Sequence, residues 1–127
     1  MTAFDEVIDV TPGRSARAAR HVTGTLAVFE THFPRFPVLP GVLILDDLVR
    51  AARLAAPDAP PGRRWTLAEA RRVRYRHFAQ PGDRLEIQVT VTAATRHEVT
   101  LKAAASVDGK DVTTVRELRL VSSEVAA

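Results

Sequence analysis

The sequence predicts an α+β fold in which one helix packs against an antiparallel sheet of five or six strands. Apolar and polar residues alternate along LEIQVTV (85–91), as expected for a strand with one buried face. A proline-free run rich in leucine, valine and alanine, from Gly41 to about Ala56, is typical of a helix. The 127 residues suffice for one domain, which we expect to span residues 1–127.

The first part of the chain predicts two strands joined by a turn. The segment FDEVIDV (4–10) spaces its apolar residues as a strand does, and Thr11-Pro12-Gly13 is typical of a turn. We expect the second strand over residues 16–29, where β-branched valine and threonine recur.

The predicted helix begins after Pro40, which suits a first helical turn because no N–H is lost there. Residues 42–45 are apolar around the whole turn, so we expect the helix to be buried on every side. One sheet covers only part of such a helix. A second copy of the chain is the simplest cover, so the sequence predicts at least a dimer.

The second half of the chain is predicted to be a meander of strands joined by short turns. Its expected strands cover residues 65–78, 85–91, 99–107 and 112–121. Gln80-Pro81-Gly82-Asp83 predicts one turn, and Asp108-Gly109 predicts a tight hairpin.

The composition narrows the classes of function. The chain has no cysteine, which excludes disulfides, thiolate nucleophiles and cysteine-ligated zinc, and His21, His77 and His97 show no metal-ligand spacing. The acidic start lacks the bases of a signal peptide, and the longest apolar stretch is far shorter than the about 18–20 residues of a membrane span. We expect a cytoplasmic protein without a metal. Its net charge of +3 favours an anionic partner.

The stiff segment HFPRFPVLPGVLILDD (32–47) carries the candidate catalytic groups. Its three prolines restrict the backbone, which suits groups that must be held in fixed positions. His32 has a reference pKa of about 6.5 and can remove a proton near neutral pH. Gly41 has no side chain, so a carbonyl oxygen can approach its N–H group at the start of the helix.

Asp46 lies within the helix among leucine and isoleucine residues, where poor solvation would favour its neutral acid form. The neighbouring Asp47 is expected to be solvated. A base, an acid and a group that polarises a carbonyl together suit the elimination of water β to an acyl carbonyl.

The segment HFPRFPVLPGVLILDDLVRAA (32–52) resembles the signature of the 3-hydroxyacyl-[acyl-carrier-protein] dehydratases. RVRYRHFAQPGDRLEIQV (72–89) is similar to the family's arginine-aromatic strand and its following P-G-D-x-L, and FDEVIDVTPG (4–13) is similar to its first strand. The resemblance extends over about residues 4–120.

The resemblance implies a hot-dog fold, in which an antiparallel sheet wraps a long helix and two chains form a continuous sheet. It implies active sites at the dimer interface, with His32 as base, Gly41 N–H as carbonyl polariser and Asp46 of the other chain as acid. The substrate would be a 3-hydroxyacyl thioester on the phosphopantetheine of an acyl carrier protein, with no metal or redox cofactor. Residues expected beside the substrate are Phe33, Pro40, Val42 and Arg50.

The chain departs from the family pattern at several positions. Thr31 replaces the usual glycine before the histidine, Arg35 replaces another frequent glycine, and Arg50 replaces a glutamine. The segment before the first strand is also shorter than usual. These departures suggest a specialised member from a polyketide or polyene pathway, and Asp46 in place of glutamate is similar to the dehydratase/isomerase branch.

Two alternatives remain open at the level of sequence. Thr31 and Arg50 favour a non-catalytic or half-catalytic subunit of a heterodimeric dehydratase. A hot-dog hydratase or thioesterase acting on coenzyme A is the other, because hydration is the reverse reaction.

A basic stripe is predicted on the strand over residues 65–78. Arg72, Arg74 and Arg76 fall on one face and residues 73, 75 and 77 on the other. This stripe suits the docking of an acidic carrier protein. The alternative is a solvated strand face. No nucleic-acid-binding motif accompanies the arginines, so we expect neither nucleic acid nor a membrane as partner.

Overall fold

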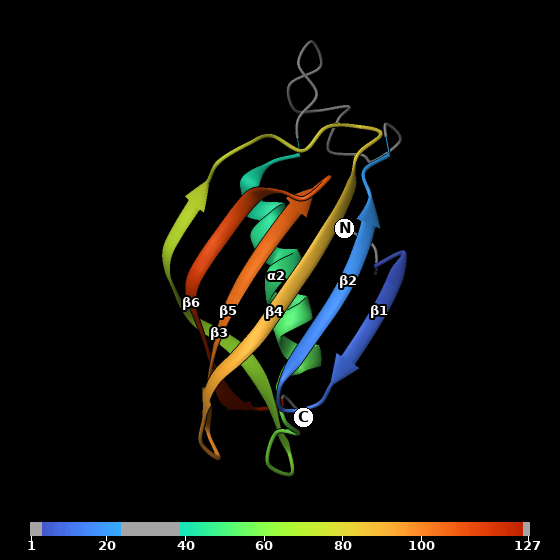
Figure 1. Cartoon of the computed structure of the whole chain (residues 1–127). Helices are drawn as coiled ribbons and strands as arrows, with labels where there is room; N and C mark the ends of the chain where they lie inside the picture. Colours follow the sequence, from blue (N-terminus) through green and yellow to red (C-terminus); the bar gives the residue numbers. More distant parts are fainter. Residues whose placement is uncertain (1–3, 24–38, 126–127) are drawn as a thin grey trace.

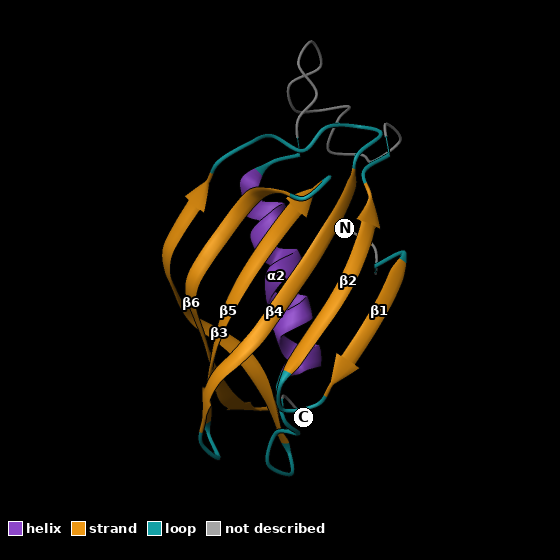
Figure 2. Ribbon diagram, viewed as in Figure 1, coloured by secondary structure: helices purple, strands orange, loops and turns teal. Residues whose placement is uncertain are grey.

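A six-stranded antiparallel sheet curls around one helix in the computed structural model, which describes residues 4–23 and 39–125 (Figures 1 and 2). The spatial order of the strands is β1-β2-β4-β5-β6-β3. The elements are β1 Glu6–Thr11, β2 Ser15–His21, α2 Gly41–Ala55, β3 Arg63–Tyr75, β4 Arg84–Ala94, β5 Glu98–Val107 and β6 Lys110–Glu124. The predicted α+β class is confirmed. None of the described helical segments is long and apolar enough to span a bilayer.

The predicted strands are confirmed, with shifts at their ends. The second strand was expected to reach residue 29 but ends at His21. Beyond β2, Val22 is hydrogen-bonded to the turn before β4. The Val22 N–H donates to Asp83 O at 2.9 Å, and the Gly82 N–H donates to Val22 O at 2.7 Å. The hairpin at Asp108-Gly109 has φ values of 50° and 79°, the conformation that a two-residue turn requires.

Helix α2 has the predicted length, and the sheet covers one of its faces in the single chain. It ends at Ala55, because Ala56 is extended before Pro57. Its inward residues recur with helical spacing and pack into the concave face of the sheet: Ile44, Asp47, Leu48, Ala51, Ala52 and Ala55. Val42, by contrast, keeps 68% of its surface exposed. In the single chain the sheet therefore covers one face of the helix, as expected, and the covering of its other faces by a second chain stays a prediction.

Close packing of small side chains sets the helix against the sheet. Ala51, Ala52 and Ala55 of α2 are fully buried, and so are Ala16 and Ala18 of β2. Larger apolar side chains fill the rest of the concave face, chiefly Leu85, Ile87, Val89, Val99, Leu101, Leu118 and Leu120. The alternation predicted for residues 85–91 is confirmed, because positions 85, 87 and 89 are the buried ones.

A buried ion pair joins the helix to β2. Arg20 Nε donates to Asp47 Oδ2 at 2.7 Å, and Arg20 Nη2 donates to Asp47 Oδ1 at 2.9 Å. The exposed fractions of the two side chains are 2% and 0%. The guanidinium carbon also lies 5.5 Å from the centre of the Phe4 ring, within the range of a cation–π contact. Asp47 was expected to be solvated, and that expectation is wrong because Arg20 supplies the partner that lets a carboxylate be buried.

We expect Asp47→Ala to lower the free energy of unfolding by about 3–5 kcal/mol, because it leaves the Arg20 charge buried without this carboxylate. The double substitution Arg20→Met/Asp47→Leu should recover most of that loss, since two apolar side chains need no hydrogen-bond partner. Chemical denaturation of the wild type and both variants measures the two differences. A loss below about 1 kcal/mol for Asp47→Ala would contradict the importance of the pair.

Candidate active site

A cleft of about 580 Å³ lies at the N-terminal end of α2. One wall consists of residues 39–42 with Ile44, and the other consists of residues 75–78, the last residue of β3 and the start of the following loop. Leu39 N–H donates to Ala79 O at 2.7 Å and ties the two walls together. Pro40 and Val42, predicted to lie beside the substrate, both line this cleft.

Gly41 opens the helix inside the cleft. Among the described residues, no side-chain hydrogen bond caps this end of α2, and the Leu43 N–H donates to Pro40 O at 3.0 Å. The first N–H groups of a helix have no carbonyl partner within the helix, so this end can bind an oxygen atom of a ligand. The Tyr75 ring lies against Gly41: a Cβ at that position would be 2.5 Å from Tyr75 Cε1. Glycine therefore leaves room for the ring as well as for a ligand.

Asp46 lies on the outward face of α2, where its side chain is 51% exposed and 3.3 Å from Arg50 Nε. Val42, Asp46, Arg50 and Leu54 follow one another at intervals of four residues and form an outward stripe along the helix. The expectation that surrounding leucines desolvate Asp46 is wrong in the single chain, because its apolar neighbours at positions 44 and 48 turn toward the sheet. Only a further surface over this stripe could desolvate it.

His32 and Phe33 lie outside the described residues, as do Thr31 and Arg35. The expected juxtaposition of His32, Gly41 and Asp46 thus remains a prediction. Among the three, the structure places Gly41 in the cleft and Asp46 on the outward stripe.

The predicted stripe of Arg72, Arg74 and Arg76 lines one hollow of about 520 Å³ on the face of the sheet away from α2. The alternation across β3 is confirmed, since Tyr75 and His77 line the cleft beside the helix instead. We call this hollow the outer-face groove and define it by its five basic side chains, Arg72, Arg74, Arg76, Lys102 and Arg116.

The sequence did not indicate several of the residues that line the cleft and the outer-face groove. His77 and Phe78 line the cleft although they were assigned no role, and Lys102 and Arg116 join the outer-face groove. The alternation of β3 already placed position 77 with Tyr75. Nothing in the sequence signalled Lys102 or Arg116, because their position depends on strand pairing.

Comparison with known proteins identifies the family. The chain matches the ApeI-like family, described as ApeI dehydratase, over residues 9–116. The chain belongs to the ApeI-like dehydratase family. It is also 36% identical to the 3-hydroxyacyl-[acyl-carrier-protein] dehydratase FabZ of Burkholderia thailandensis over 111 residues, which cover 84% of this chain and 69% of that relative. For the same enzyme of Shewanella oneidensis the identity is 36% over 115 residues, with 86% and 75% covered.

Solved structures confirm the hot-dog fold of this ApeI-like chain. The dehydratase heterocomplex ApeI:P from Xenorhabdus doucetiae matches with a TM-score of 0.72 at 24% identity, covering 94% of this chain and 99% of the other. A hot-dog-like protein from Thermanaerovibrio acidaminovorans matches with a TM-score of 0.72 at 18% identity, covering 91% and 85%. The protein smu.793 from Streptococcus mutans, bound to acetyl CoA, gives 0.75 at 11% identity, covering 100% and 94%.

We expect Gly41→Ala to displace the Tyr75 ring from the start of α2, because the new methyl group would lie 2.5 Å from Tyr75 Cε1. Tyr75 is the only tyrosine in the chain, so a fluorotyrosine label reports its environment alone in a fluorine NMR spectrum. Leu54→Ala is the matched control, since Leu54 is 39% exposed on the same helix and does not line the cleft. An unchanged fluorine shift in Gly41→Ala would contradict the contact.

Proposed function

We propose that this ApeI-like chain eliminates water from 3-hydroxyacyl thioesters carried on an acyl carrier protein, giving 2-enoyl thioesters. The observation that carries the proposal is the cleft at the start of α2, where Gly41 lies among mainly apolar residues and no described side chain caps the helix. Membership of a dehydratase family and 36% identity to two carrier-dependent dehydratases support the reaction class. No metal or redox cofactor is part of the proposal. The lack of cysteine agrees with a cytoplasmic setting.

The proposed chemistry assigns one role to each group. His32 removes a proton from the carbon next to the thioester carbonyl, and the electron pair moves toward the carbonyl oxygen. The Gly41 N–H donates to that oxygen and stabilises its developing negative charge, with the helix dipole adding to the effect. The electron pair then returns to form the double bond, and Asp46 gives its proton to the departing hydroxyl group, which leaves as water.

The exposure of Asp46 supports a site completed by a second chain. In the single chain the Asp46 carboxylate is 51% exposed and lies 3.3 Å from Arg50 Nε, so it lacks the water-excluded surroundings that suit proton transfer in the proposed site. A partner over the outward stripe would remove the water. Among the described strands, the 13-residue β3 is hydrogen-bonded to β6 alone, so it is an edge strand able to pair with another chain. We therefore propose that the working unit is a dimer in which Asp46 serves the partner's His32.

The Asp46–Arg50 ion pair favours a second candidate function. A carboxylate engaged by a neighbouring guanidinium suits a subunit in which that residue does not act as the acid, as in a heterodimer with one working site. The structural likeness to a dehydratase heterocomplex agrees with this candidate.

In either case we propose a specialised biosynthetic pathway, such as that of a polyketide or polyene, on the basis of Thr31, Arg35 and Arg50.

We expect the pure protein to convert a 3-hydroxyacyl carrier protein to a species lighter by one water molecule, measured by intact-mass spectrometry. His32→Ala and Asp46→Asn should each lower the rate by about 10²–10⁴-fold, the usual contribution of a positioned base or acid. Asp58→Asn, which removes an exposed carboxylate in the loop after α2, is the matched control.

Three outcomes separate the candidates. Full activity of Asp46→Asn removes Asp46 as the acid. A pure chain that neither dehydrates hydroxyacyl substrate nor hydrates enoyl substrate supports the heterodimer, which is then sought by co-purification with a second hot-dog chain. Faster turnover of the coenzyme A thioester than of the carrier thioester favours a coenzyme A hydratase.

A further inference from the structure

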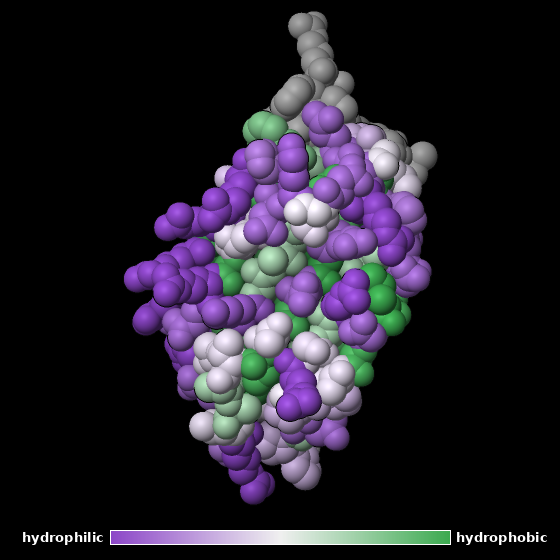
Figure 3. Space-filling model, in the orientation of Figure 1, coloured by the Kyte–Doolittle hydropathy of each residue, from purple (hydrophilic) through white to green (hydrophobic). Residues whose placement is uncertain are grey.

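The outer-face groove is distinguished by cations that have no acidic partner within the described part of the chain. Arg72, Arg74, Arg76, Lys102 and Arg116 all line it, and among the described residues no acid lies within ion-pair distance of any of them. All five side chains are exposed. Figure 3 shows long hydrophilic side chains projecting from the β3 and β6 side of the molecule.

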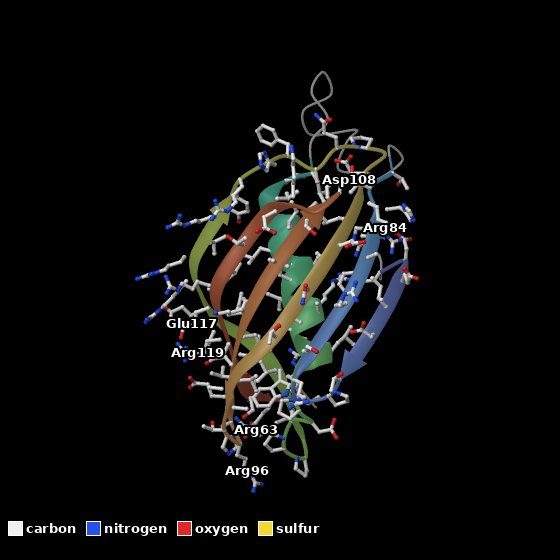
Figure 4. All side chains as sticks on the ribbon, in the orientation of Figure 1. Arg63, Arg84, Arg96, Asp108, Glu117 and Arg119 are labelled. Atoms are coloured by element: carbon white, nitrogen blue, oxygen red, sulfur yellow. The ribbon has the colours of Figure 1, made fainter. Side chains whose placement is uncertain are left out.

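Other arginines of the same two strands are neutralised. Arg71 Nε donates to Glu69 Oε1 at 2.7 Å, and Arg119 Nη2 donates to Glu69 Oε2 at 3.3 Å. These bonds, first that from Arg71, hold the pKa of Glu69 below its ordinary value. Glu117, labelled in Figure 4, lines the adjoining hollow, and its Oε2 lies 3.7 Å from Arg71 Nε. The lack of acidic partners is thus a property of the groove, not of every arginine on these strands.

The register of the strands places several cations of the outer-face groove close together, where they repel one another. Because Arg71 pairs with Glu117 and Val73 with Val115, Arg72 lies directly opposite Arg116. Lys102 lies on the next strand, and like charges on neighbouring strands repel. Arg72 also has a φ of 55°, which bulky side chains seldom adopt. An anion bound in the groove would relieve the repulsion.

The outer-face groove is deep at its centre because the residues between its long side chains are small. Arg74 pairs with Thr114, which pairs with Ala104, which in turn pairs with Gln88. A threonine and an alanine between an arginine and a glutamine leave a depression across four strands. The depression offers hydroxyl and amide groups as well as charge.

Arg76 lines both the outer-face groove and the cleft at the start of α2. The two cavities lie on opposite faces of the sheet and meet at the end of β3, near the start of α2. A bound group in the groove can therefore extend a flexible arm past Arg76 toward Gly41. This continuity connects the anion-binding surface to the proposed reaction.

We propose that the outer-face groove is the docking surface for an acidic carrier domain, whose acyl-phosphopantetheine arm enters the cleft past Arg76. The proposal rests on the proposed carrier-bound substrate, and it adds Lys102 and Arg116 to the stripe read from the sequence. A single-stranded nucleic acid fits less well, because the aromatic side chains Tyr75 and Phe78 line the cleft and none lines the groove. A second copy fits less well because two cationic grooves repel each other.

The test measures binding without chemistry. The full chain in its native oligomeric state is titrated with an apo-carrier domain, which lacks the phosphopantetheine arm, and fluorescence anisotropy gives the Kd. Arg116→Glu and Lys102→Glu should each raise the Kd about tenfold, and raising the salt concentration should weaken wild-type binding. Arg96→Glu is the matched control, because it makes the same charge change at an exposed turn between β4 and β5, at the end of the molecule away from the start of α2 (Figure 4). It should change the Kd less than about twofold.

Each contrary result is distinguishable. Equal effects of Arg116→Glu and Arg96→Glu, or the absence of wild-type carrier binding, would overturn the docking surface. A shift in oligomeric mass for Arg116→Glu with carrier binding unchanged would assign the groove to contacts between copies. Loss of single-stranded DNA binding in Arg116→Glu, with carrier binding unchanged, would assign the groove to nucleic acid. Groove-dependent binding by a chain that fails to dehydrate would leave this proposal standing and reject only the proposed activity.

Discussion

The buried ion pair between Arg20 and Asp47 determines how helix α2 is rotated against the sheet. A carboxylate is tolerated at full burial only with bidentate hydrogen bonds of the kind that Arg20 provides. Successive helical residues are about 100° apart, so holding Asp47 against β2 turns Asp46 away from the sheet. The same rotation places Val42 and Arg50 outward with Asp46. The exposure of the candidate acid is therefore a consequence of its neighbour's burial.

Strand β3 serves both faces of the sheet. Alternation sends Tyr75 against Gly41 in the cleft and sends Arg72 and Arg74 to the outer-face groove. Arg76, just past the strand, borders both cavities. A single extended segment thus relates the proposed reaction site to the proposed docking surface, and a change in the position of β3 would affect both. As an edge strand, β3 is also the natural place for another chain to pair.

The single chain contains only part of the site that we propose. Its cleft is lined mainly by apolar residues and no described side chain caps the start of its helix, which suits binding of an acyl carbonyl oxygen. Its acid, however, is half exposed to water and ion-paired with Arg50. General acid catalysis and exclusion of water both require a further covering surface. This physical requirement, together with the exposed side chains of Val42 and Leu54, explains why we place the reaction at an interface.

The sequence by itself determined the helix over residues 41–55, the order of the strands along the chain and the alternation that separates Arg74 from Tyr75. These features follow from local periodicity and turn chemistry, which need no knowledge of distant residues. Only the tertiary structure decided which of two adjacent aspartates is buried, because the deciding partner, Arg20, lies 27 residues before Asp47. Likewise, Lys102 and Arg116 meet Arg72 only through the register of three strands, and register is a long-range property of the folded sheet.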